Sequence, residues 1–138
     1  MRLMSCVAGL AVVLSLAAVS ARAADCPAKS TAMDDIVEAL SATPDCDRAM
    51  KLFEACEFGA SGDVRLGAIV EHKCEGDFLA RLKAPRRQAY RREMRVCDRK
   101  YRNQSGTMAL SFTAFCRATV AQHYSQGVRK VAGSSPVR

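Results

Sequence analysis

Six cysteines remain in the chain once its first 23 residues are set aside, and this even number constrains the fold more than any other feature. They are Cys26, Cys46, Cys56, Cys74, Cys97 and Cys116. An even set of cysteines behind an export signal is typical of a disulfide framework, whereas free thiols and metal ligands are typical of cytosolic chains. The compartment of the protein therefore decides what these cysteines do.

The first 23 residues have the three parts of a secretory signal peptide. Arg2 supplies the positive start, 7–19 is an apolar run, and Ala21-Arg22-Ala23 is a small-x-small cleavage site. The apolar run is shorter than the ~20 residues that a membrane-spanning helix requires, and a retained anchor is the alternative. Cleavage removes Cys6, so we expect a soluble mature chain that begins near Ala24 and is periplasmic or secreted.

Acidic and basic side chains are separated along the mature chain. Residues 24–75 include 11 acidic and 5 basic side chains, a net charge of −6, whereas 76–138 include 3 acidic and 14 basic side chains, a net charge of +11. The two halves should therefore attract different partners.

The hydrophobic pattern is helical almost throughout the mature chain, and no stretch alternates as a strand would. The chain has the length of one domain. We predict an all-α, disulfide-stapled antiparallel bundle of four main helices, with a short extra helix over 32–41. The domain should cover 24–127, with Gly127 ending the last helix and 128–138 forming a flexible tail.

The inward faces of the last helices follow from their apolar periodicity. Asp63 should cap a third helix, whose expected inward residues are Leu66, Ile69, Val70 and Cys74. The helix over about 86–102 is the clearest, because its apolar side chains fall within about 60° of one another. These are Tyr90, Met94, Cys97 and Tyr101. The expected inward residues of the final helix are Met108, Phe112, Phe115, Cys116 and Val120.

The disulfide pairing is only partly constrained by the sequence. Cys46 and Cys56 cannot pair with each other, because ten helical residues separate them by about 15 Å and disulfide-bonded Cα atoms lie within about 7 Å. Six cysteines allow fifteen connectivities. Tight hairpins would place Cys56 near Cys97 and Cys46 near Cys116, which leaves Cys26 for Cys74.

Neither a metal site nor a catalytic site is predicted. The two histidines are His72 and His123, and no C-x-x-C motif occurs. A cysteine nucleophile would need a free thiol with a base beside it, and disulfides can consume all six thiols. His123 is expected at the edge of the core. We therefore expect a protein that is not an enzyme and has no cofactor.

Arginines form a stripe beside and opposite the inward face of the helix over 86–102. They are Arg87, Arg91, Arg95, Arg99 and Arg102. A solvated helix face is the simpler interpretation, and an anion-binding face formed by Arg91, Arg95 and Arg99 is the functional one. In an exported protein its ligand would be anionic lipid, acidic glycan or protein. Nucleic acid is not expected, because the stripe lacks base-stacking aromatic residues.

Four segments between Cys46 and Tyr124 occur in a recognisable order. The first is CDRAMKLFEAC, which runs from Cys46 to Cys56, and the second is DVRL, which runs from Asp63 to Leu66. The third is RRQAYRREMRVC at 86–97, and the fourth is SGTM at 105–108, which Cys116 follows. Together they resemble the lysozyme-inhibitor LprI-like family of bacterial envelope proteins, which implies a helical domain. The sequence departs from the family pattern at Gly67, where Asn is usual, and at Tyr90, where Trp is usual. Compared with the cysteines of the family pattern, Cys26 and Cys74 look like an additional disulfide.

The resemblance implies inhibition of lysozyme. Animal-type lysozymes are generally basic, so the acidic half should make the contact, because like charges repel. Asp45, Asp47 and Glu54 are the candidate contacts. We therefore expect an exported, non-enzymatic binding protein whose partner is lysozyme or another envelope protein. The alternative is a structural or interaction protein of the envelope that binds anionic lipid or glycan through its arginine-rich helix.

Overall fold

The computed structural model describes residues 25–133, which fold entirely into helices, turns and connecting segments without a strand. The predicted signal peptide and the last five residues lie outside this range. The elements are α1 (Met33–Ala42), α2 (Cys46–Ala55), α3 (Gly62–Phe78), a 3₁₀ turn η1 (Leu79–Arg81), α4 (Ala84–Lys100) and α5 (Thr107–Gly133). The predicted all-α, disulfide-stapled bundle is therefore confirmed.

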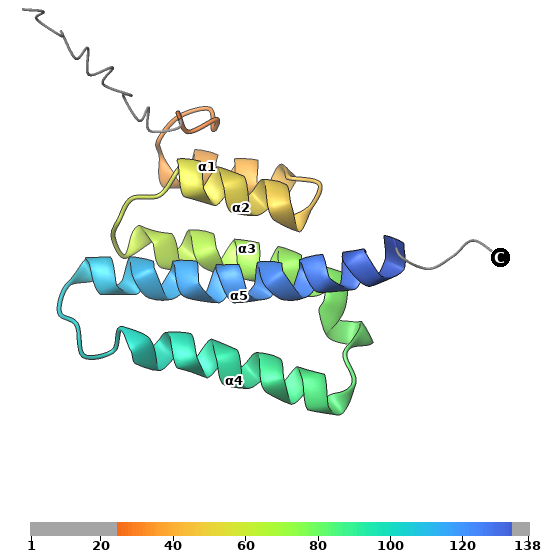
Figure 1. Cartoon of the computed structure of the whole chain (residues 1–138). Coiled ribbons are helices and arrows are strands. Elements are labelled where there is room, and N and C mark those ends of the chain that lie inside the picture. Colours follow the sequence, from red (N-terminus) through yellow and green to blue (C-terminus); the bar gives the residue numbers. More distant parts are fainter. Residues whose placement is uncertain (1–24, 134–138) are drawn as a thin grey trace, which may run out of the picture.

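The helices are arranged around α3 and α5, which share the most extensive interface (Figure 1). The short helices α1 and α2 cover one side of this pair, and α4 lies on the other side against α5. Each of α3 and α5 runs antiparallel to α4, so the two central helices run in the same direction (Figure 1). This arrangement leaves the outer side of α4 open to solvent.

Large side chains from α1, α2 and α3 form the core, together with aromatic residues of α4 and α5. The fully buried apolar side chains include Ile36, Leu40, Phe53, Leu66, Val70 and Phe78. Phe53 stacks on Phe115 with 4.1 Å between ring centroids. The Tyr90 and Tyr124 rings meet at 5.0 Å, and each contacts Phe78. These contacts join all the layers, since the rings come from α2, α3, α4 and α5.

The interface between α3 and α5 depends on small side chains. A Cβ atom at Gly67 would lie 2.9 Å from the Ala114 Cβ and 3.2 Å from the Ala114 carbonyl oxygen. Real Cβ contacts are longer, so the two helices can approach this closely only with glycine at 67. Ala118 and Ala121 continue the buried side of α5.

The predicted inward face of the last helix is partly wrong for this reason. Met108 and Phe112 are exposed, with 56% and 43% of their surface accessible. The residues that face α3 are instead small, and they include Ser111 and Ala114. Because α3 lies so close, large apolar side chains do not fit between the two helices.

Gly127 does not end the last helix as predicted, because α5 continues through it to Gly133. A single glycine inside a helix costs only about 1 kcal/mol, and the neighbouring turns of α5 remain packed through Tyr124 and Ser125. Residues 134–138 lie beyond the described range.

All six cysteines within residues 25–133 form disulfides, but the predicted pairing is wrong. The bonds are Cys26–Cys56, Cys46–Cys74 and Cys97–Cys116, with Cα atoms 4.7, 4.7 and 5.6 Å apart. The pairs Cys56–Cys97, Cys46–Cys116 and Cys26–Cys74 do not form. The start of α2 lies beside the C-terminal part of α3, which brings Cys46 to Cys74, and the C-terminal part of α4 lies beside the first half of α5, which brings Cys97 to Cys116. Two of the disulfides thus join consecutive helices, whereas Cys26–Cys56 joins the segment before α1 to the end of α2.

Among residues 25–133, no helix combines the length and the apolar character that crossing a bilayer requires.

Candidate functional site

The outer side of α4 carries four exposed arginines, which we call the arginine face. They are Arg91, Arg92, Arg95 and Arg99. At 100° per residue they occupy a sector of about 100° on the side opposite the core. Tyr90, Met94 and Cys97 are the buried residues of the same helix, so burial of the apolar stripe fixes the arginines on the outside. The predicted anion-binding residues therefore lie together on one open surface.

The two acidic residues of α4 bond to side chains of α5, and Glu93 also borders a surface hollow that Arg92, Arg95 and Arg99 line. Glu93 accepts a hydrogen bond from the Tyr124 hydroxyl at 2.7 Å. Asp98 accepts one from the Arg117 guanidinium at 2.8 Å. Within residues 25–133, none of the four arginines forms an ion pair or a side-chain hydrogen bond. The face therefore carries an excess of positive charge, with the one carboxylate of Glu93 at its edge.

The spacing of these arginines is unfavourable for the isolated helix. Arg91, Arg95 and Arg99 follow one another at four-residue intervals. Like charges at this spacing destabilise a helix by about 0.2–0.5 kcal/mol per pair. An anion bound across the face would relieve this repulsion, because one negative group can interact with two successive guanidinium groups.

Arg87 belongs to the predicted stripe but has a different role. Its Nη2 group donates to the Leu79 and Leu82 carbonyl oxygens, at 3.4 and 3.2 Å. These bonds hold the turn that connects α3 to α4. Arg102 lies in the turn after α4 and is exposed.

Asp45, one of the three predicted lysozyme contacts, has a structural role. Its carboxylate accepts a hydrogen bond from the Arg48 backbone N–H at 2.8 Å, which caps α2. It also lies 3.6 Å from the Arg48 side chain.

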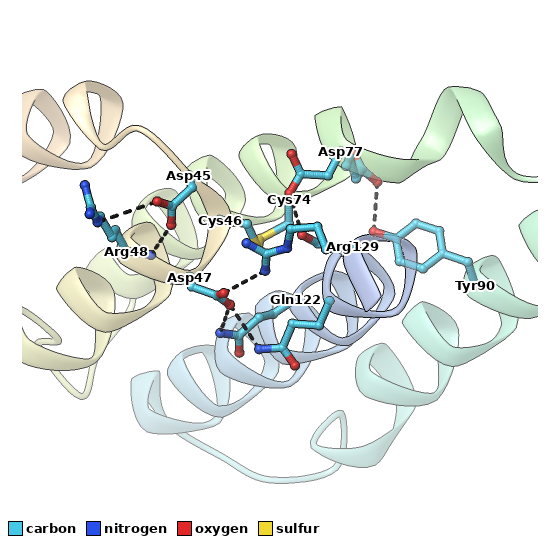
Figure 2. Close-up of a disulfide and its surroundings, with 12 residues drawn as sticks. Asp45, Cys46, Asp47, Arg48, Cys74, Asp77, Tyr90, Gln122 and Arg129 are labelled. Carbon is cyan, nitrogen blue, oxygen red and sulfur yellow. Dashed lines mark hydrogen bonds and ion pairs between the residues drawn. A yellow bond between two sulfur atoms is a disulfide. The ribbon is translucent and has the colours of Figure 1, made fainter. Parts of the chain in front are cut away.

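Asp47 joins α2 to α5 (Figure 2). Its carboxylate accepts hydrogen bonds from Gln122 at 2.9 Å, Gln126 at 3.0 Å and Arg129 at 2.7 Å. The hydrogen bond from Gln126 contributes most to holding the pKa of Asp47 below its usual value. Of the three predicted contacts, Glu54 is the one that is exposed and without an ion pair among residues 25–133.

Arg117 organises a second polar cluster, which the sequence analysis missed. Its guanidinium donates to both Glu71 oxygens, at 2.7 and 2.9 Å, and also to Asp98. Bonding to Glu71 is the main cause of the raised Arg117 pKa. The cluster lines a hollow of about 420 Å³ between α3, α4 and α5. A signal was present in the sequence, since Arg117 is the one charged residue between Thr107 and Val128.

The tyrosines of the core have partners that explain their positions. The Tyr90 hydroxyl donates to Glu75 at 2.9 Å. Burial raises the pKa of Tyr90, and the neighbouring Glu75 carboxylate adds to this rise. Burial and Glu93 raise the pKa of Tyr124 in the same way. Both groups stay protonated and serve as hydrogen-bond donors that attach α4 to its neighbours.

The histidines lie apart from each other. His72 and His123 are both exposed, so His123 does not lie at the edge of the core as predicted. Between residues 25 and 133, no three His, Cys, Asp or Glu side chains are placed so that they could hold a metal ion.

No family model, curated protein or solved structure matches the chain. The functional argument therefore depends on the geometry of the described residues.

Proposed function

We propose that the protein is an exported, non-enzymatic binding protein that holds an anionic lipid or glycan of the cell envelope on the arginine face. The observation that carries this proposal is the excess of positive charge on the arginine face, where four arginines form no ion pair within residues 25–133 and the neighbouring acids bond to α5. A protein with three disulfides is typical of compartments outside the cytoplasm. The finer assignment to the periplasm follows from the proposed signal peptide.

The rest of the structure supports a rigid binding surface. The Cys97–Cys116 disulfide attaches α4 covalently to α5, and the Tyr90 and Tyr124 hydroxyls add two hydrogen bonds between helices. The arginines are thus held on a fixed helix, and a ligand does not have to order this backbone when it binds. Arginine also forms paired hydrogen bonds with phosphate and carboxylate groups, which favours specific contacts with such ligands.

Neutralising Arg91, Arg95 and Arg99 together with glutamine should weaken binding to anionic vesicles by at least about tenfold, because each basic residue near such a surface contributes about 1 kcal/mol. Vesicle co-sedimentation measures the binding, and circular dichroism should show an unchanged helix content. Binding by the wild-type protein should also weaken as salt rises, since the Debye length shortens to about 8 Å at 0.15 M.

A matched control separates the position of the charges from their number. The variant Arg48→Gln, Lys51→Gln, Arg65→Gln removes three exposed positive charges from the acidic half. It should bind vesicles nearly as well as the wild-type protein. If vesicle binding weakens equally in the two variants, the net charge alone would account for binding, and a specific arginine face would be contradicted.

We propose lysozyme inhibition as a second candidate function, from the resemblance to the LprI-like family. The favourable observation is that Glu54 and Glu57 are exposed near the end of α2 and have no ion pair within residues 25–133. Phe58 beside them is also exposed, at 43%. Carboxylates next to an exposed aromatic ring could enter the cleft of a basic enzyme.

The protein should then slow lysis of a peptidoglycan substrate by an animal-type lysozyme at stoichiometric concentration. Glu54→Gln combined with Glu57→Gln should reduce this inhibition severalfold, because charge attraction across the interface is lost. The pair Asp34→Asn and Glu38→Gln removes the same charge from α1 and serves as the control. A fully active lysozyme in a large molar excess of wild-type protein would show that the candidate function is wrong.

A further inference from the structure

A hollow of about 450 Å³ lies at one end of the arginine face, where α3, η1 and α4 meet. Its lining residues are His72, Glu75, Gly76, Leu79, Ala80, Arg87 and Arg91. Arg91 belongs both to this hollow and to the arginine face. The hollow is therefore continuous with the surface that the proposed function uses.

The Arg87 guanidinium in this hollow has fewer acceptors than it has N–H groups. Its Nη2 group is fixed by two backbone carbonyl oxygens, those of Leu79 and Leu82. Its Nε atom is buried and has no hydrogen-bond acceptor among residues 25–133. The Nη1 group also has no acceptor among residues 25–133 and is not buried, so it is the part of this guanidinium that can bind an additional acceptor in the hollow.

The charges around the hollow favour an anion as that acceptor. Arg91 lies one helical turn after Arg87 and has no ion pair within the described range. The one carboxylate in the lining, Glu75, already accepts the Tyr90 hydroxyl. Two guanidinium groups therefore face one carboxylate in the lining of the hollow.

We propose that this hollow is a subsite for a phosphate group, held between the Arg87 and Arg91 guanidinium groups. The inference rests on the proposed function and names the group that the arginine face would recognise. A phosphate offers three or four oxygens, whereas a carboxylate offers two, and two guanidinium forks require more than two acceptors. The lining of the hollow includes Gly76 and Ala80, whose small size leaves room for the phosphate.

Titration of the full exported protein with inorganic phosphate tests the subsite. The side-chain Nε–H resonances of Arg87 and Arg91 should shift in nitrogen-15 spectra, with those of Arg95 and Arg99 changing less. Arg91→Gln should weaken phosphate binding at least fivefold, whereas Arg99→Gln on the same helix should leave it within twofold. Equal shifts of all the arginines would overturn the proposal, because they would indicate only ionic screening.

Gly76 offers a way to fill the hollow without disturbing Arg87. A Cβ atom at this position would meet no atom within 4 Å, so a side chain there enters open space. Gly76→Leu should reduce phosphate binding at least tenfold and keep the helix content, while Gly76→Ala should bind within twofold of the wild-type protein. Unchanged binding by Gly76→Leu would overturn the proposal.

Vesicles containing phosphatidic acid distinguish a lipid headgroup from free phosphate. Weaker vesicle binding by Gly76→Leu than by Gly76→Ala would identify the ligand as a headgroup that enters the hollow. Equal vesicle binding with lost phosphate binding would identify free phosphate as the ligand. The triple variant that tests the arginine face also changes Arg91, which lines the hollow. The double variant Arg95→Gln, Arg99→Gln keeps Arg91, so weaker vesicle binding by this variant tests the arginine face independently of both results.

Discussion

Replacing Asp63 with alanine should lower the free energy of unfolding by about 3–5 kcal/mol, because it removes a buried carboxylate that accepts four hydrogen bonds. The donors are the backbone N–H groups of Phe58, Gly59 and Ala60, at 2.8, 2.9 and 3.3 Å, and the Ser111 hydroxyl, at 2.6 Å. The Asp63 side chain is completely buried. Without it, the 58–60 loop and the start of α5 lose their common acceptor, and urea denaturation measures the loss.

Two further variants locate the origin of this effect. Ser111→Ala removes one donor and leaves the loop bonds intact, so it should cost only about 1–2 kcal/mol. Asp34→Ala removes an exposed acid that pairs with Arg65 at 3.2 Å, and it should cost less than about 1 kcal/mol. A loss below 1 kcal/mol in Asp63→Ala would show that water replaces the carboxylate at no significant cost.

The role of Asp63 was only partly predictable from the sequence. The residue begins a helical segment, as expected, but it lies inside the first turn of α3 and caps the preceding loop rather than the helix. An acidic residue near a helix start favours the helix dipole in general. Its hydrogen bond with Ser111 joins residues 48 positions apart. A local sequence pattern does not indicate a contact between residues so far apart in the chain.

The helices themselves were largely predictable, because their apolar stripes are local. The helix over 86–102 matches α4 within two residues at each end. Tyr90, Met94 and Cys97 are buried as the periodicity indicated, whereas Tyr101 follows the helix and is only partly buried. Phe112 shows where this reasoning fails. The hydrophobic pattern of α5 contains both large and small apolar residues, and only the close approach of Gly67 to Ala114 selects the small ones for the interior.

The candidate site was predictable to a similar degree. Arg91, Arg95 and Arg99 could be placed on one face from their spacing alone. What the sequence could not show is that Glu93 and Asp98 turn away toward α5, since that depends on Tyr124 and Arg117. The charge of the arginine face therefore follows from tertiary contacts that bind the neighbouring acids.

The Cys46–Cys74 disulfide should be the most important of the three for stability (Figure 2). Both of its cysteines are fully buried, and the bond joins α2 to the C-terminal part of α3. Replacing both with alanine should cost about 3–5 kcal/mol, a loss that is large relative to the 5–15 kcal/mol of a typical domain. The Asp47 cluster keeps α2 near α5, so helix content should fall less than thermal stability.

The Cys26–Cys56 disulfide provides a control with nearly the same loop length. The sequence separations are 28 for Cys46–Cys74 and 30 for Cys26–Cys56, so the entropy of the unfolded chain should change almost equally in the two double-alanine variants. Any difference between the two losses in free energy of unfolding then reflects how deeply each disulfide is buried. Cys26 is only partly buried, whereas Cys46 and Cys74 are inside the core. We expect the buried pair to cost at least about 1 kcal/mol more, as cavities in a packed core do. Equal losses in urea denaturation would mean that loop closure alone accounts for both bonds and that core packing adds nothing.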